Sequence, residues 1–457
     1  MGTTNWPQTR GEFQPHRAIK IPKPLCGYGC NAPGRFVGYV RIYCVGKKVK
    51  IIGIDVSAHR VDVVLLEKFP TIALRDFYLS PEFKQVHCVY ETNEIQDLVD
   101  RIGDCAAVAI LEGTGTYSYF WKEQLQKKGI FVLVADQGLV KATRRSLGGT
   151  DNKDDEFDAL VMCELYRRHY LEIYDRRFWV KELNPKVQEI RRTLLDLKTT
   201  TRKQTSFVNT IKGRLAWEYA ARATVKSVRP NGFLKTGQPP AFWAWLAERG
   251  EFLSKAVVSR FENHYHKEQQ SDRANISDLT RQFAAAICDL HDIEAALELH
   301  LIELLGDSLF DRYHQVFDRF AFGHRERGWI LSRIYPFEDF QCLPKKRALR
   351  RFRQACGLGK VEKSSGQVRA GGGGGKWTGC ANTRSTMWTY INCRIEPQKL
   401  KGQAYTPVQL ELREYFLGRA LDADGTKKRG GRLADARNAS CRKLADLVFR
   451  ELYNEIR

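Results

Sequence analysis

Apolar residues in the first half of the chain recur in short runs that predict alternating strands and helices. Val49–Val56 and Val61–Leu66 are largely apolar and are separated by a short turn, which is the pattern of a β-hairpin. Ala106–Leu111 and Ile130–Ala135 are two further strand-like runs. Helical spacing is found over Asn93–Ile102, Tyr117–Lys128 and Asp155–His169. This interleaving predicts an α/β domain with a mixed sheet at residues 49–180.

The rest of the chain is predicted to be mainly helical. Apolar residues at helical spacing over 183–222 and 276–305 predict long arms, with the composition of a coiled-coil or bundle core. These arms could pair with each other or between subunits. A segment with Pro and Gly at 227–240 predicts a loop between them. We expect four regions around the α/β domain: a basic extension at 1–48, a helical linker with an insertion at 181–322, a mainly α C-terminal domain at 323–405, and basic terminal helices at 406–457.

The chain is strongly basic. It has 74 Lys and Arg against 53 Asp and Glu, a formal charge of +21 over 457 residues. Release of counterions favours binding of such a protein to a phosphate backbone. Met1–Arg17 lacks the apolar segment of a secretory signal, and no apolar run is long enough to span a bilayer. We therefore expect a cytoplasmic, nucleoid-associated protein with nucleic-acid partners and no membrane association.

Cysteines add little to this interpretation. The chain has 12, mostly scattered, and a reduced cytosolic protein is the simplest explanation. Cys26 and Cys30 flank Gly-Tyr-Gly, with Cys44 further on, but no clear fourth zinc ligand is present. Ordinary thiols are therefore favoured over a zinc site.

Four acids stand where a metal site could form. Asp55 and Glu112 end or follow predicted strands, and Asp155 and Asp158 lie three residues apart at the start of a predicted helix, which puts both on one helical face. Converging carboxylates can hold two divalent ions for phosphoryl transfer. Any one of these acids alone is more often a cap or a solvated charge, and Asp155 could simply cap its helix. The neighbouring acids Asp154 and Glu156 could be mistaken for ligands. Glu156 is expected to point off the face that Asp155 and Asp158 share.

The same residues carry a resemblance to a known family. The matching segments are Gly53-Ile-Asp55-Val-Ser, Leu111-Glu-Gly-Thr-Gly-Thr-Tyr117 and Lys153-Asp-Asp-Glu-Phe-Asp-Ala159. Residues 51–169 resemble the RuvC-like domain, of RNase H fold, in the DEDD transposases of bacterial insertion sequences, the insertion-sequence 110 family, to which Piv-type DNA invertases are related. The resemblance implies Mg²⁺ (or Mn²⁺) bound by Asp55, Glu112, Asp155 and Asp158.

The resemblance extends weakly to a second domain with a catalytic serine. Leu358-Gly-Lys-Val-Glu-Lys-Ser-Ser365-Gly366 is similar to the family's Ser-Gly motif and places the nucleophile at Ser365, with Ser364 as its neighbour. A later Gly-Asn-x-x-x-Arg pattern falls on Gly379–Arg384, but Cys380 stands at the Asn position. The family implies a phosphoserine intermediate, donor and target DNA, a guiding bridge RNA, and a homodimer or homotetramer.

Basic residues are expected to contact nucleic acid. Arg384 could also stabilise phosphoryl charge or be a plain surface cation. The expected contacts are Lys141, Arg144, Arg145, Lys345, Lys346, Arg347, Arg350, Arg351 and Arg384.

Three other interpretations remain open. A stand-alone RuvC-like nuclease, such as a junction resolvase, would need the four acids and not Ser365. A non-catalytic nucleic-acid-binding remnant is suggested by the departure at Cys380. An actin-like ATPase shares the opening Gly53-Ile-Asp-Val-Ser, but its phosphate loop needs Gly and Thr where this turn has Ala58-His-Arg60.

Overall fold

The computed structural model divides into two compact units, one ending at Lys181 and the other beginning at Glu182. Several predicted features lie outside the described residues: the extension with Cys26, Cys30 and Cys44, most of the 227–240 loop, and both Ser364 and Ser365. The described residues are 49–91, 93–103, 105–113, 115–148, 154–226, 238–361, 376–397, 404–422, 425–426 and 429–456.

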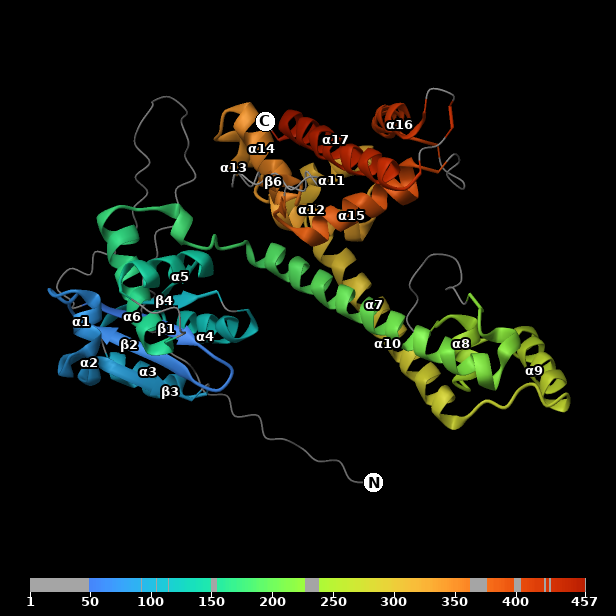
Figure 1. Cartoon of the computed structure of the whole chain (residues 1–457), viewed down its shortest axis with the longest axis horizontal. Helices are drawn as coiled ribbons and strands as arrows, with labels where there is room; N and C mark the ends of the chain where they lie inside the picture. The colour runs from blue at the N-terminus through green and yellow to red at the C-terminus, as the bar shows by residue number, and fades with distance from the viewer. Residues whose placement is uncertain are drawn as a thin grey trace, which may run out of the picture. The chain divides into compact units, whose positions relative to one another are not determined.

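The first unit is built on a five-stranded mixed sheet in the order β3-β2-β1-β4-β5 (Figure 1). Strands β1 and β2 form the predicted hairpin, and β3 adds to it antiparallel. Strand β4 runs parallel to β1, and β5 runs parallel to β4. The strand bounds are β1 Val49–Val56, β2 Val61–Leu66, β3 His87–Tyr90, β4 Ala106–Glu112 and β5 Phe131–Ala135.

Helices cover both faces of this sheet, so its central strands are buried on both sides. One face packs against α1 (Leu74–Leu79), α2 (Pro81–Val86), α5 (Gln137–Ser146) and α6 (Asp155–Tyr166). The other face packs against α3 (Ile95–Ile102) and α4 (Thr116–Lys127). Side chains alternate between the two faces along each strand, and this alternation decides which residues reach α6.

Helix α6 lies directly on β1. A Cβ atom on Gly53 would stand 1.8 Å from the carbonyl oxygen of Ala159 in α6, so only glycine allows the two backbones to come this close. Residues 51 and 55 share the face of Gly53, since side chains alternate along a strand. The close approach therefore brings the N-terminal turn of α6 to the end of β1 where Asp55 lies.

The second unit contains the two predicted helical arms. Helix α7 (Pro185–Glu218) is one continuous helix, and it packs antiparallel to α10 (Asp278–Leu305) within the chain. A polar contact joins them near their middle, where Gln204 donates a hydrogen bond to Glu294 at 2.7 Å. The far end of the pair carries a small core with α8 (Ala241–Leu246) and α9 (Lys255–Gln270).

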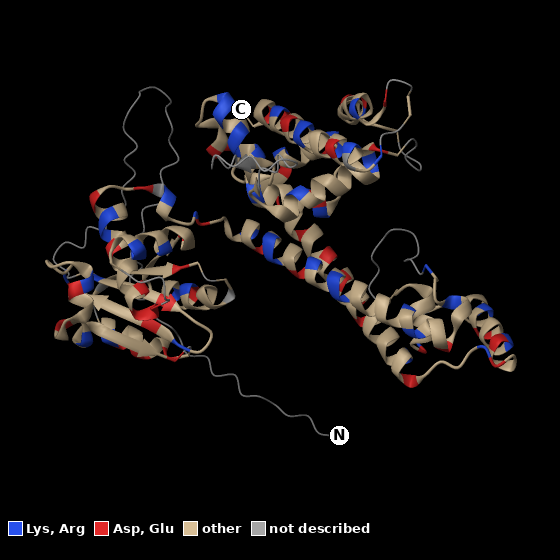
Figure 2. Cartoon of the chain, in the orientation of Figure 1, with Lys and Arg blue, Asp and Glu red and all other residues tan. Residues whose placement is uncertain are grey.

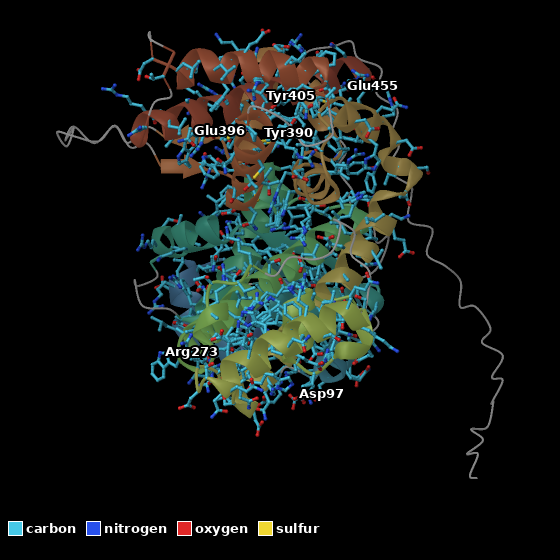
Figure 3. The ribbon with its side chains drawn as sticks, turned by 90° about the vertical axis from the view of Figure 1, so that its right-hand side faces the viewer. Asp97, Arg273, Tyr390, Glu396, Tyr405 and Glu455 are labelled. Carbon is cyan, nitrogen blue, oxygen red and sulfur yellow. The ribbon has the colours of Figure 1, made fainter. Side chains whose placement is uncertain are left out.

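The near end of the pair joins a larger helical core. The terminal helices α16 (Pro407–Ala420) and α17 (Gly431–Glu455) pack into the same core as the preceding helices. Polar contacts hold this region: Tyr390 donates a hydrogen bond to the carbonyl oxygen of Phe320 at 2.8 Å, and Glu396 accepts one from Arg437 at 2.6 Å (Figure 3). The other elements here are α11 Asp311–Arg319, α12 His324–Ile334, α13 Glu338–Gln341, α14 Lys345–Ala355, α15 Ala381–Tyr390, β6 Gly359–Val361 and β7 Lys376–Thr378.

The α/β domain and the helical region that follows it are thus present. Sequence patterns missed β3 and the short helices α1 and α2, which lie between the hairpin and α3. Across the described ranges, no helix combines the length and the apolar character that crossing a bilayer requires.

Candidate functional site

Two buried aspartates face each other near the turn of the β1–β2 hairpin. Asp55 and Asp62 are directly opposite in the antiparallel register, and they are 1% and 0% exposed. Both lie on the α6 face, since Val64 and Leu66 of β2 pack there. The sequence analysis missed Asp62. Its signal was present, because Asp55 and Asp62 are equally spaced about the turn and Asp62 is the polar residue in an apolar strand.

Opposing interactions act on the pKa of Asp62. Its Oδ2 atom accepts a hydrogen bond from Arg60 Nε at 3.1 Å. Burial raises the pKa of Asp62, Arg60 lowers it, and the negative charges of Asp155 and Glu156 raise it again, so the net pKa lies above the ordinary value. The other oxygen, Oδ1, is buried and accepts no hydrogen bond from the described residues.

Glu112 brings a third carboxylate to this end of the sheet. It is the last residue of β4 and is 7% exposed. Ile54 and Leu111 are paired in the parallel ladder, so Asp55 and Glu112 follow them at the ends of adjacent strands. Glu112 shares the α6 face with Val108 and Ile110 of its strand.

The first turn of α6 adds three more acids. Asp154, not Asp155, is the N-cap: its side chain accepts a hydrogen bond from Phe157 N at 3.1 Å and another from the Tyr78 hydroxyl. The alternative in which Asp155 caps the helix is therefore wrong. Asp155, Glu156 and Asp158 occupy the first turn, where the positive end of the helix dipole stabilises negative charge.

Asp158 is paired with a buried arginine. Arg144 on α5 donates a hydrogen bond from Nη1 to Asp158 Oδ2 at 2.6 Å, and the two side chains are 7% and 5% exposed. Arg144 was expected to contact nucleic acid from the surface. That expectation is corrected, because its guanidinium is buried against the acids and neutralises one of them.

Glu156 lies in a second group of possible metal ligands. Ligand atoms of Asp62, His87 and Glu156 all lie within 4.8 Å of one another, and this group could hold a metal ion. The three residues come from β2, β3 and α6. This trio differs from the predicted set of Asp55, Glu112, Asp155 and Asp158, which shares the same end of the sheet.

The residues at this end fit a divalent cation. Carboxylate oxygens are the donors that Mg²⁺ and Mn²⁺ prefer. Asp55, Asp62 and Glu112 are buried acids on neighbouring strands, and the unsatisfied Oδ1 of Asp62 is an oxygen that a cation could satisfy. Water is largely excluded from these three side chains, so a cation would compensate charge that solvent reaches poorly.

A second feature lies in the helical unit, at the segment expected to follow the serine motif. A pocket of about 690 Å³ opens beside the N-terminus of α15. Gly379 has a φ of +92°, and a Cβ there would stand 1.7 Å from the carbonyl oxygen of Gln354, so this crossing requires glycine. The lining residues include Arg333, Arg351, Gln354, Gly379, Cys380 and Asn382.

Cys380 lies in this pocket at the N-cap of α15. Burial alone would raise the pKa of its thiol. Hydrogen bonds from Thr383 and the nearby positive charge of Arg333 outweigh burial, so the pKa of Cys380 lies below its ordinary value. The residue that departs from the family pattern is thus placed in an electropositive setting.

The expected nucleic-acid residues of α14 are all exposed, and Figure 2 colours the Lys and Arg positions along its ribbon blue. Ala348 and Phe352 on its other side are buried in the core. Arg384 instead donates a hydrogen bond to the carbonyl oxygen of Gly357 at 3.0 Å. On α5, Lys141 and Arg145 are exposed. The exposed basic residues of α14 are Lys345, Lys346, Arg347, Arg350 and Arg351.

No protein-family model matches the chain, and no curated protein is significantly similar to it.

Proposed function

We propose that this protein is a metal-dependent DNA recombinase of the DEDD transposase type, with an RNase H-like (RuvC-like) first unit. One observation carries the proposal: Asp55 and Glu112 end adjacent parallel strands on the face that α6 covers, and Asp155 and Asp158 lie in the first turn of α6. The sheet order 3-2-1-4-5, in which β1, β2 and β3 are antiparallel neighbours and β4 and β5 run parallel to β1, supports the RNase H-like assignment.

In this proposal Asp55, Glu112, Asp155 and Asp158 hold Mg²⁺ (or Mn²⁺). The bound metal would supply charge stabilisation and an activated hydroxyl for phosphoryl transfer. The remaining residues act as positioning groups. Asp154 caps α6 and fixes where its first turn begins, and Arg144 holds the Asp158 carboxylate in one orientation.

The covalent step is assigned to Ser365, which lies outside the described residues. Its hydroxyl oxygen attacks a DNA phosphorus atom, the bond from phosphorus to one strand oxygen breaks, and that oxygen leaves as a strand hydroxyl after taking up a proton. A hydroxyl of a second strand then attacks the phosphoserine, which joins the strands and returns the serine. The pocket with Arg333 and Arg351 supports a phosphate-binding role for this part of the chain.

The nucleic-acid partners follow from charge. The five exposed cations of α14 can contact a phosphate backbone, and the chain carries +21 overall. We propose donor and target DNA and a structured guide RNA as partners, and a dimer or tetramer as the active form.

The test uses purified full-length protein, its co-purifying RNA, and a plasmid that carries the gene with its flanking DNA. Wild type should yield Mg²⁺-dependent recombinant product and a protein–DNA adduct that survives denaturing gels. Ser365→Ala should lose both, whereas Ser364→Ala serves as the matched control and should keep both. Asp55→Asn should also lose both.

Two outcomes would overturn the proposal. Full recombination by Ser365→Ala excludes the covalent serine. Strand cleavage without any adduct, lost in Asp55→Asn but kept in Ser365→Ala, identifies the alternative, a RuvC-like nuclease that cuts with metal-activated water. That alternative needs only the acids of the first unit.

A further inference from the structure

A histidine joins two carboxylates beside the proposed magnesium site. His87 lies on β3, opposite Val64 of β2, and so faces α6 with Asp62. Glu156 reaches the pair from the first turn of α6. Ligand atoms of the three side chains lie within 4.8 Å of one another. The group therefore draws one donor from each of three elements.

The spacing within this group fits a shared ion better than a hydrogen bond. His87 Nδ1 and Glu156 Oε2 are 3.7 Å apart, which is too long for a hydrogen bond. Two ligands bound at about 2.1 Å to one tetrahedral ion stand about 3.4 Å apart. A small shortening of the distance between His87 Nδ1 and Glu156 Oε2 would let both atoms bind one ion.

A second observation concerns Asp62. Its side chain is 1% exposed, and its Oδ1 atom accepts no hydrogen bond from the described residues. An unsatisfied buried carboxylate oxygen costs free energy, and a bound cation would remove that cost. Glu156 is 38% exposed on its side chain and gives an ion a path from solvent.

We propose that Asp62, His87 and Glu156 form a transition-metal site separate from the four acids assigned to Mg²⁺. One imidazole and two carboxylates suit Zn²⁺ or Mn²⁺, whereas Mg²⁺ favours all-oxygen sites. Three protein ligands leave a position for water. The ion clips β2, β3 and α6 together and thereby fixes the first turn of α6, from which Asp155 and Asp158 project. The site does not depend on the recombinase proposal.

The test detects nitrogen bound to Mn²⁺, a probe that avoids the thiols of this chain. Tag-free full-length protein is loaded with Mn²⁺, and pulsed electron paramagnetic resonance measures coupling of the metal to ¹⁴N. Wild type should show coupling to one imidazole, and added Zn²⁺ should abolish it by displacement. His87→Gln should lose the coupling, while His59→Gln, which changes an exposed histidine of the hairpin turn, should keep it.

Two further variants make the result decisive. Glu156→Gln alters a partly exposed ligand with little risk to folding, and it should weaken Mn²⁺ binding at this site at least about 10-fold. Asp55→Asn removes a proposed Mg²⁺ ligand and should leave the nitrogen coupling intact, so failure of the recombinase proposal remains distinguishable. Absence of ¹⁴N coupling in wild type, or its persistence in His87→Gln, would overturn the proposal.

Discussion

The buried pair of Arg144 and Asp158 offers the sharpest test of how the acids are held. Arg144 Nη1 and Asp158 Oδ2 are 2.6 Å apart, and neither side chain is more than 7% exposed. Replacing Arg144 with Ala leaves the Asp158 carboxylate buried near Asp155 without its guanidinium. Because Asp158 is only 3% exposed, its charge is then compensated less well in the folded state than in the unfolded chain.

The expected magnitude follows from burial. Removing one partner of a buried ion pair costs about 3–5 kcal/mol, whereas Lys141→Ala on the exposed side of the same helix should cost within about 0.5 kcal/mol. Changing Asp158 to Asn in the Arg144→Ala background removes the charge that Arg144 had neutralised. The double variant should therefore recover part of the loss, with a coupling energy of about 2–3 kcal/mol.

The assay must report on the first unit alone, since a chain with two compact units need not unfold in one step. Hydrogen exchange followed by mass spectrometry gives the opening free energy of α5 and α6 separately from the helical unit. A cost for Arg144→Ala no larger than that for Lys141→Ala would refute the reasoning. So would strictly additive effects of Arg144→Ala and Asp158→Asn, because additivity means that the two side chains do not interact.

Addition of Mg²⁺ provides a second test on Arg144 and Asp158. If Asp158 is a metal ligand, a bound dication can neutralise it when Arg144 is absent. Saturating Mg²⁺ at about 100 times its Kd would then stabilise the site by about 2.7 kcal/mol. Exchange in α6 of Arg144→Ala should slow on adding Mg²⁺, and equal exchange with and without Mg²⁺ would count against metal binding at Asp158.

Three further changes test other parts of the structure. Gly53→Ala should destabilise the first unit by more than about 3 kcal/mol, because the added Cβ would clash with the α6 backbone. Gly213→Ala in α7, where the added Cβ meets open space, should stabilise its helix by about 0.5–1 kcal/mol. Hydrogen exchange measures both effects. The lowered pKa of Cys380 predicts that its alkylation rate reaches half-maximum at a lower pH than that of a free cysteine peptide, as measured by peptide mass spectrometry; a midpoint at or above that of the peptide contradicts it. Arg350→Ala on α14 should lower the slope of log binding constant against log salt by about 0.9 for DNA, whereas Arg260→Ala on α9 should not.

Local patterns predicted the elements whose signal is contained in their own residues. The expected bounds of the β1–β2 hairpin are those observed, because two apolar runs and a short turn specify a hairpin locally. The apolar spacing of α7 likewise agrees with its packing, since Val187 and Ile190 near its start and Leu215 near its end are buried. On α10 the same spacing was less informative, since Leu279 and Ile293 are about half exposed.

Pairing across the chain was the part that local patterns missed. Strand β3 has four residues, too few for a periodic signal, and its place is set by hydrogen bonds to β2. That pairing is what brings His87 into the site. Arg144 looked like a surface cation within a basic segment, and only the packing of α5 on α6 turns it inward to Asp158. The grouping of Glu156 with Asp62 and His87 was missed for a related reason, since it depends on how β2 and β3 lie against the first turn of α6.

The acids themselves argue for function rather than stability. Six carboxylates gather where β1, β2 and β4 meet α6, and burial raises the pKa of Asp62 against the charges around it. Folding is opposed by such like-charge crowding, which Arg60 and Arg144 offset locally. A fold optimised for stability would replace buried charges with apolar side chains of similar size. Positions that break the local rules in this way are where functional sites are expected. A bound cation is the simplest ligand that would relieve the repulsion among these carboxylates. Metal binding is therefore the first property to measure.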